Sequence, residues 1–138
     1  MFVLDSDTLS LLFRGHGRVT ERVARATEEV AITLISRIEI LQGRFASLLK
    51  AENREKLLQA QRRLDESEKD LNQFTILVID SAAAAEFERL RPNKKPKKIG
   101  RADLLIAALT LANRATLVTR NRKDFGQVPG LDIEDWSV

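Results

Sequence analysis

The sequence predicts an α/β fold: a three-layer α/β/α domain with a central parallel sheet of four to five strands. Short apolar segments, partly β-branched, have the composition of buried strands at residues 2–4, 30–36, 75–80 and 116–119, and residues 131–136 suit a last edge strand. Segments with helical spacing separate them, which favours parallel strands joined by helical crossovers. The length of 138 residues, 43% of them hydrophobic, suits one domain over residues 1–138.

The helices are expected between these strands. The predicted ranges are 8–14, 18–28, a helix from Ser36 with a break near Gly43, 46–73, 81–91, 102–115 and a short helix within 120–126. Residues 46–73 contain neither glycine nor proline, and Leu57, Leu64 and Leu71 recur at heptad spacing, which predicts a helical arm packed along one line. Residues 102–115 are apolar nearly all round, so this helix is expected in the core.

The composition excludes several kinds of chemistry. The chain has no cysteine and no tyrosine, which rules out disulfides, zinc–thiolate sites and thiol or phenol nucleophiles. The only histidine is His16, between two glycines, so a ribonuclease that uses paired histidines is excluded. There is no P-loop and no dinucleotide-binding GxGxxG motif. We expect no signal peptide, no membrane span and a cytoplasmic location.

A basic segment precedes the apolar helix. The chain carries a formal charge of +3, and residues 89–101 hold seven cations and no acid. We expect Lys94, Lys95, Lys97, Lys98 and Arg101 to contact RNA, and the alternative is a solvated loop. Aromatic residues make up only 5% of the chain, so recognition would depend on shape and backbone contacts more than on base stacking.

Acidic residues from distant parts of the chain are expected at one edge of the sheet. Asp5 follows the first strand, Glu39 lies in the helix after the second, and Asp103 opens the apolar helix. Asn121 and Asp124 follow the fourth strand. Function in parallel sheets lies at the carboxyl ends of the strands, so this edge is the predicted site.

Each of these acids also has a structural explanation. Asp5 or Asp7 suits a helix N-cap, and Ser36 with Glu39 fits a capping box. Asp103 suits the positive end of a helix dipole, and Asp124 suits a cap or an ion pair with Arg120 or Arg122. The hydroxyls of Ser6, Thr8 and Thr119 suit caps, or groups that orient a water or a metal.

Together the acids favour a metal site over these separate explanations. An unpaired carboxylate at Asp103 would be costly in an otherwise apolar segment. Clustered carboxylates repel one another and raise each other's pKa unless a cation lies between them. Oxygen ligands select a hard ion such as Mg²⁺ or Mn²⁺, which activates water and stabilises charge on a phosphoryl group.

Four motifs in this order resemble PIN-domain ribonucleases of the VapC toxin type: FVLDSDTLSLL, ISRIEILQG, IGRADLLIAALTLANRATLVTRNRKDF and VPGLDIEDWS. The resemblance implies an Mg²⁺- or Mn²⁺-dependent endoribonuclease with Asp5, Glu39, Asp103 and Asp124 as its catalytic acids. It implies Asp5, Asp103 and Asp124 as metal ligands. It gives Asn121 the role of a neutral ligand or water-orienting group, and it gives Asp7 a supporting role.

The resemblance also implies partners. They are an RNA substrate such as tRNA, a small inhibitory antitoxin protein and a second copy of the chain in a homodimer. The leucine-striped helix over 53–72 is a plausible antitoxin-docking surface.

Two other functions stay open from the sequence. A haloacid-dehalogenase-like phosphatase would use Asp5 as its nucleophile and Asp7 as its acid–base group, although Leu9 departs from that pattern. A PIN-fold module that binds without catalysis is the second.

Overall fold

The structure is a computed structural model that describes residues 1–91 and 99–138. Its sheet has five strands in the order β3-β2-β1-β4-β5, and every neighbouring pair is parallel. The strands are β1 (Phe2–Leu4), β2 (Val30–Thr33), β3 (Thr75–Leu77), β4 (Thr116–Val118) and β5 (Asp132–Glu134). The predicted parallel sheet is therefore confirmed, including the edge strand near the C-terminus.

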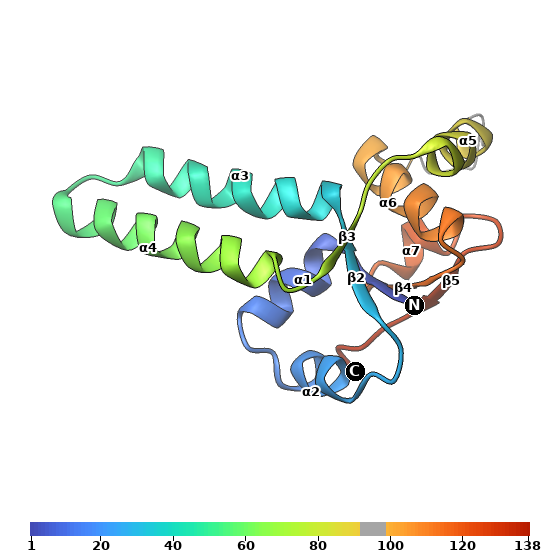
Figure 1. The fold of residues 1–138 in the computed structure, drawn as a ribbon, viewed down its shortest axis with the longest axis horizontal. Coiled ribbons are helices and arrows are strands. Elements are labelled where there is room, and N and C mark those ends of the chain that lie inside the picture. The colour runs from blue at the N-terminus through green and yellow to red at the C-terminus, as the bar shows by residue number, and fades with distance from the viewer. Residues whose placement is uncertain (92–98) are drawn as a thin grey trace.

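Helices cover both faces of the sheet (Figure 1). They are α1 (Ser6–Phe13), α2 (Gly17–Arg25), α3 (Leu34–Lys50), α4 (Arg54–Leu71), α5 (Ser81–Leu90), α6 (Arg101–Ala112) and α7 (Arg122–Phe125). Adjacent strand residues point to opposite faces, so Val3 and Leu4 belong to different hydrophobic clusters. The three-layer prediction is confirmed.

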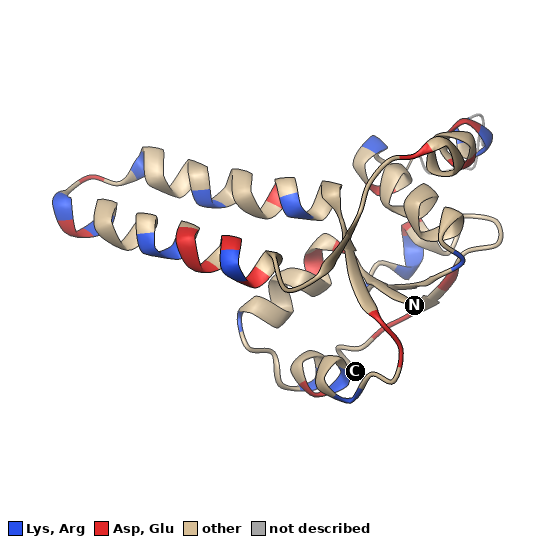
Figure 2. Cartoon of the chain, in the orientation of Figure 1, with Lys and Arg blue, Asp and Glu red and all other residues tan. Residues whose placement is uncertain are grey.

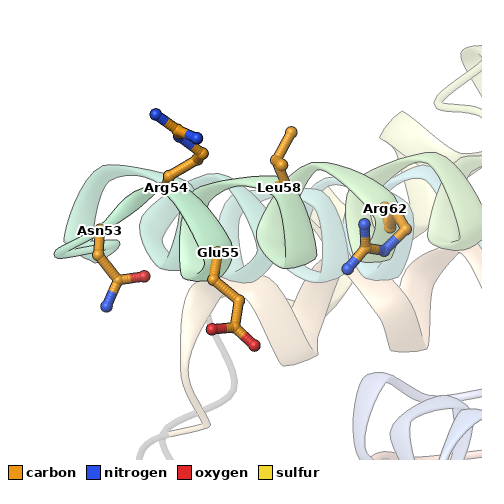
Figure 3. Close-up of a pocket in the computed structure, with 5 residues that line it drawn as sticks. All are labelled: Asn53, Arg54, Glu55, Leu58 and Arg62. Atoms are coloured by element: carbon orange, nitrogen blue, oxygen red, sulfur yellow. The ribbon is translucent and has the colours of Figure 1, made fainter.

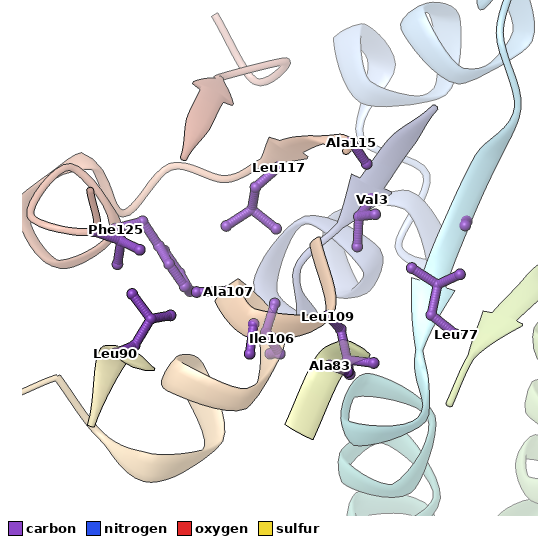
Figure 4. Packing of buried hydrophobic residues seen from close by; sticks show 13 residues of the cluster. Val3, Leu77, Ala83, Leu90, Ile106, Ala107, Leu109, Ala115, Leu117 and Phe125 are labelled. Carbon is purple, nitrogen blue, oxygen red and sulfur yellow. The ribbon is translucent and has the colours of Figure 1, made fainter. Parts of the chain in front are cut away.

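The cluster beneath α5 and α6 forms the larger part of the core (Figure 4). Val3 and Leu117 from the sheet meet Ile106 and Leu109 from α6, and each is at most 1% exposed. Full burial of such a side chain stabilises the fold by roughly 2 kcal/mol. Residues 106–110 are all buried, which confirms the predicted core position of this helix.

The helical arm is a hairpin of α3 and α4 that projects from the sheet (Figure 1). The predicted break near Gly43 is wrong, because α3 continues to Lys50; a glycine within a helix costs only about 1 kcal/mol relative to alanine. The predicted unbroken helix over 46–73 is also wrong. The side chain of Asn53 accepts a hydrogen bond from the backbone N–H of Lys56 at 2.9 Å and begins α4 there.

The leucine stripe does not form one packing line. Leu71 is fully buried against the sheet, whereas Leu57 is 48% exposed on the arm. Charges of both signs follow one another along α4, as Figure 2 shows. The inner end of the arm therefore belongs to the core, and its outer end presents apolar and charged side chains to the surroundings.

Capping residues shift several other predicted boundaries. The first helix begins at Ser6 and not at Thr8, because Asp5 is its N-cap. The second strand ends at Thr33 and not at residue 36, because Thr33 caps α3 by accepting a hydrogen bond from the backbone N–H of Ser36 at 3.2 Å. The third strand ends at Leu77, and Asp80 caps α5.

The C-terminal end of α6 also differs from the prediction. This helix ends at Ala112, three residues before the predicted end at residue 115. Arg114 adopts a left-handed conformation with φ of 51°, which turns the chain towards β4. Within the described ranges, no helix is both long enough and apolar enough to cross a bilayer.

Candidate active site

The strand order changes direction between β1 and β4. The chain moves outward from β1 through β2 to β3 and then crosses back to β4 on the other side of β1. In open parallel sheets, ligands bind at the carboxyl ends of the strands beside such a switch point. Asp5 follows β1 and Thr119 follows β4, so these two residues stand at that crevice.

Asp5 is buried and hydrogen-bonded on both carboxylate oxygens. The hydroxyl of Thr119 donates to Oδ2 at 2.6 Å, and the backbone N–H of Thr8 donates to Oδ1 at 2.8 Å. Burial raises the pKa of Asp5 above its ordinary value, and the hydrogen bonds from Thr119 and Thr8 counteract that rise. Asp5 thus caps α1 and also lines the pocket. The cap and the place at the site, which the sequence presented as alternatives, are compatible.

Asp103 interacts electrostatically with Asp5, Glu39 and Asp124. It lies in the first turn of α6, and its carboxyl is about half buried. Burial is the largest cause that raises the pKa of Asp103, followed by repulsion from Asp5, Glu39 and Asp124. The four acids that the sequence singled out therefore come together in space, from four separate segments of the chain.

Hydroxyl groups orient Glu39 from the neighbouring helix. The hydroxyl of Ser6 donates to Oε1 of Glu39 at 2.7 Å, and the hydroxyls of Ser6 and Ser36 lie 2.9 Å apart. Because Ser6 has one hydroxyl proton, Ser36 is the donor to Ser6 in this arrangement. The predicted Ser36–Glu39 capping box is wrong, since α3 begins earlier. Sequence reasoning missed Ser36 as part of the site, although it stands one helical turn before Glu39 on the same face.

Asn121 holds Asp124 in place. The Oδ1 of Asn121 accepts from the backbone N–H of Asp124 at 3.2 Å, and its Nδ2 donates to Oδ2 of Asp124 at 3.0 Å. The hydroxyl of Thr119 accepts from the backbone N–H of Asn121 at 2.9 Å, which connects this group to Asp5. The structure shows no ion pair of Asp124 with Arg120 or Arg122 among the described residues.

Asp7 lies at the edge of the site and pairs with Arg120. The Nε of Arg120 donates to Oδ2 of Asp7 at 2.7 Å, and Nη2 donates to Oδ1 at 3.0 Å. The sequence offered Arg120 only as a partner for Asp124. Its position beside Asp7 was missed because the two residues are 113 positions apart in the chain.

These side chains surround a pocket of about 430 Å³. Its lining consists of Asp5, Ser6, Asp7, Glu39, Asp103, Arg120, Asn121 and Phe125. No group of three or more acidic or histidine side chains in residues 1–91 and 99–138 is already arranged to hold one metal ion. Asp5, Asp7, Glu39 and Asp103 therefore share this pocket, whereas Asp124 lies outside its lining and is held by Asn121.

The predicted RNA-binding residues are only partly within the described ranges. Lys94, Lys95, Lys97 and Lys98 lie outside them. Arg101 is exposed at the start of α6, with its guanidinium carbon 5.0 Å from the centroid of the Phe87 ring. A second pocket lies at the tip of the arm, where Asn53, Arg54, Glu55, Leu58 and Arg62 line it (Figure 3). That pocket has a single carboxylate, so the acidic pocket is the better candidate for catalysis.

Comparison with known proteins identifies the family. The PIN domain family matches residues 2–131. The chain belongs to the PIN domain family. Ribonuclease VapC2 of Rickettsia felis is 34% identical to this PIN domain over 111 residues, which are 78% of this chain and 74% of that protein. The tRNA(fMet)-specific endonuclease VapC of Salmonella typhimurium is 27% identical over 138 residues, covering 98% and 97% of the two chains.

Solved structures agree with this assignment. A chain in the crystal structure of DNA-bound VapBC from Salmonella typhimurium matches this PIN domain with a TM-score of 0.83 and 26% identity, covering 98% of this chain and 97% of that one. A chain of VapBC2 from Rickettsia felis, bound to a promoter DNA fragment, matches with a TM-score of 0.76 and 28% identity over 98% of each chain. The resemblance to VapC-type PIN domains is therefore confirmed.

Proposed function

We propose that this PIN domain is an Mg²⁺- or Mn²⁺-dependent endoribonuclease and the toxic member of a toxin–antitoxin pair. The observation that supports the proposal most is that Asp5, Glu39 and Asp103 line one pocket at the strand switch point, with Asp124 near enough to raise the pKa of Asp103 after burial and the other two acids. The names of the VapC relatives, a ribonuclease and a tRNA endonuclease, point to the same reaction class.

The donor set of the pocket suits a hard divalent cation. Asp5, Asp103 and Asp124 would supply carboxylate oxygens, which Mg²⁺ and Mn²⁺ prefer as ligands. The rise in the pKa of Asp103 from its acidic neighbours is the electrostatic condition that a bound cation relieves. Such an ion, when bound, lowers the pKa of a water molecule and stabilises negative charge on a phosphodiester.

The remaining residues have roles that follow from their hydrogen bonds. Thr119 and the backbone N–H of Thr8 fix the orientation of the Asp5 carboxylate, and Asn121 fixes that of Asp124. Ser6 holds Glu39 through Oε1, and we assign the Glu39 carboxylate on the pocket lining to accept the proton of the attacking water.

The phosphatase alternative fits the structure poorly. That reaction assigns no role to Glu39, which lies on the same pocket lining as Asp5. An acid–base role for Asp7 needs a carboxyl that exchanges protons, and Asp7 is paired with Arg120. The module that binds without catalysis keeps the same fold, and the activity assay below distinguishes it.

We assign RNA binding to the cations that precede Asp103 in the sequence. Arg101 stands two residues before Asp103, and the lysines at 94, 95, 97 and 98 precede it in the sequence. A structured RNA such as tRNA is the proposed substrate class, because base stacking is limited by the low aromatic content. A cytoplasmic location is part of the proposal, because the proposed RNA substrate is found there.

The antitoxin is proposed to dock on the outer part of the arm. The structural relatives above 25% identity are chains of VapBC assemblies from Salmonella typhimurium and Rickettsia felis. The arm exposes large apolar side chains at Phe45, Leu49, Leu57 and Leu58, between 48% and 70% exposed. Exposed apolar groups of this kind mark interaction surfaces. Homodimer formation, which the resemblance implies, stays part of the proposal.

One assay tests the proposed reaction against both alternatives. The purified protein is incubated with total RNA and, separately, with a generic phosphomonoester, in Mg²⁺ or in EDTA. We expect RNA cleavage in Mg²⁺ only, and its loss in Asp103→Asn and Asp5→Asn. Asp65→Asn, an exposed carboxylate on the arm, is the matched control and should cleave normally. Hydrolysis of the phosphomonoester would favour the phosphatase, and inactivity towards both substrates would favour the binding module.

A further inference from the structure

The ion pair of Asp7 and Arg120 contributes little to the stability of the fold. Both side chains are 47% exposed. Water and salt screen an ion pair that is this exposed, so its contribution to the stability of the fold is small. The pair nevertheless lies on the lining of the acidic pocket. Its place beside the catalytic groups therefore needs an explanation other than stability.

The charge of the pocket gives that explanation. Among the described residues that line it, Arg120 is the one cation, beside the acids Asp5, Asp7, Glu39 and Asp103. An RNA backbone that approaches this lining meets repulsion from the carboxylates. A guanidinium at the rim offers the approaching phosphate a favourable partner.

The geometry of the pair leaves Arg120 able to bind a second anion. Its two bonds to Asp7 use Nε and Nη2, so Nη1 is not engaged by them. Two parallel bonds fix the plane of the guanidinium as well as its position. Arg120 is the next residue after Thr119, whose hydroxyl donates a hydrogen bond to Asp5. The position of Arg120 is therefore linked to that of the Asp5 carboxylate through the backbone.

We propose that Arg120 binds a phosphate of the RNA substrate at the rim of the acidic pocket and that Asp7 is the residue that positions it. This inference rests on the proposed ribonuclease function and adds a substrate contact to it. Arg120 would hold the phosphate backbone beside the acids, and Asp7 would keep the guanidinium at the rim.

The affinity for RNA in EDTA tests the role of Arg120 without cleavage. Fluorescence anisotropy of a labelled single-stranded RNA gives the dissociation constant over a series of salt concentrations. We expect Arg120→Gln to weaken binding about tenfold and to reduce the slope of log K against log salt by about 0.7. Arg120→Lys keeps the positive charge but loses the planar guanidinium and its paired N–H donors. It should therefore keep the slope of log K against log salt and lose only part of the affinity.

Arg122→Gln is the matched control. It removes the same charge two residues away, from an exposed side chain that does not line the pocket. We expect its affinity to stay within about twofold of the wild type. If Arg120→Gln and Arg122→Gln lose affinity equally, while the wild type still cuts RNA in Mg²⁺, the inference is overturned and the proposed function stands. A wild type that neither binds nor cuts RNA overturns both.

A double-mutant cycle tests the role of Asp7. On charge grounds alone, Asp7→Ala strengthens RNA binding, because a negative charge is removed from the rim. If Asp7 positions Arg120, Asp7→Ala instead weakens binding about threefold, and this loss disappears when Arg120 is already glutamine. Stronger binding in both backgrounds would contradict the positioning role. The exposure of the pair means that all these variants should fold with near-normal thermal stability.

Discussion

The hydrogen bond from Thr119 to Asp5 allows a quantitative prediction for Thr119→Val. Both residues are buried, with exposures of 0% and 5%, and the hydroxyl also accepts from the backbone N–H of Asn121. Valine keeps the shape of threonine and removes both bonds. Loss of a hydrogen bond to a buried carboxylate costs about 2 kcal/mol, and the unpaired N–H of Asn121 costs about 1 kcal/mol more.

The total predicted loss is about 3 kcal/mol. With an unfolding entropy of roughly 2.1 cal/mol/K per residue, 138 residues give a fall of about 10 °C in Tm. The hydrogen bond from Thr119 lowers the pKa of Asp5, so it stabilises the ionised form more than the neutral form. The destabilisation should therefore be larger at neutral pH than in acid, where Asp5 becomes protonated.

Thr110→Val is the matched control for this measurement. Thr110 is also 0% exposed, but its hydroxyl donates to the carbonyl of Ile106 within α6 and contacts no charge. Its loss should cost less than about 1 kcal/mol and should not depend on pH. Urea unfolding of both variants at neutral pH and in acid, near the ordinary carboxyl pKa of 3.8, measures the difference. Equal, pH-independent losses for the two variants would refute the reasoning about Asp5.

Other expected outcomes concern Asp103 and the arm. Asp103→Asn should raise the free energy of unfolding at neutral pH in EDTA while abolishing RNA cleavage, because burial and three neighbouring acids raise the pKa of Asp103. A raised pKa means that the folded state binds the proton more tightly than the unfolded state does. The ionised carboxylate of Asp103 therefore destabilises the fold. This destabilisation, which asparagine removes, is absent below pH 3.8 and grows as the pH rises above that value. Unfolding curves at two pH values check this, and a destabilised Asp103→Asn at neutral pH would contradict it. The double substitution of Leu57→Glu and Leu58→Glu should weaken binding of the cognate antitoxin at least tenfold. The Tm should change little, because both side chains are about half exposed. Pull-down and calorimetry measure the affinity, and an unchanged affinity would exclude this part of the arm as the docking surface.

The sheet and the acidic pocket could be predicted from patterns that are visible in the sequence. A buried strand needs consecutive apolar residues, as in Phe2–Leu4, and parallel strands gather their carboxyl ends at one edge. An acid that directly follows the central strand, as Asp5 follows β1, therefore lies at this edge, and Asp103 reaches it from the first turn of the buried helix α6. This is why Asp5 and Asp103 were predictable although 98 residues separate them.

The helix boundaries were less predictable because several residues compete to cap each helix. Both Thr33 and Ser36 are good N-cap residues, and the backbone conformation selected Thr33. The turn between α3 and α4 similarly depends on Asn53, which capped a new helix where local propensity favoured continuing the old one. The misplacement of Ser36 and Glu39 in a capping box followed from the first of these errors.

Contacts between exposed residues distant in sequence were not predictable at all. The sequence suggested Asp124 as the partner of Arg120, and only the tertiary arrangement selects Asp7. The hydroxyl network of Ser6 and Ser36 likewise depends on the packing of α1 against α3. These polar contacts refine a site whose charge was already apparent.

The origin of the oxygen in the cleaved phosphate tests the central claim most directly. The purified protein is incubated with RNA in heavy-oxygen water, with Mg²⁺ or with EDTA, and the product ends are analysed by mass spectrometry. A water activated in the acidic pocket predicts labelled oxygen in the newly formed phosphate ends, in Mg²⁺ only, and no label or cleavage with Asp103→Asn. Cleavage that persists in EDTA, or products that end in an unlabelled 2′,3′-cyclic phosphate, would contradict a metal-dependent hydrolysis at these four acids.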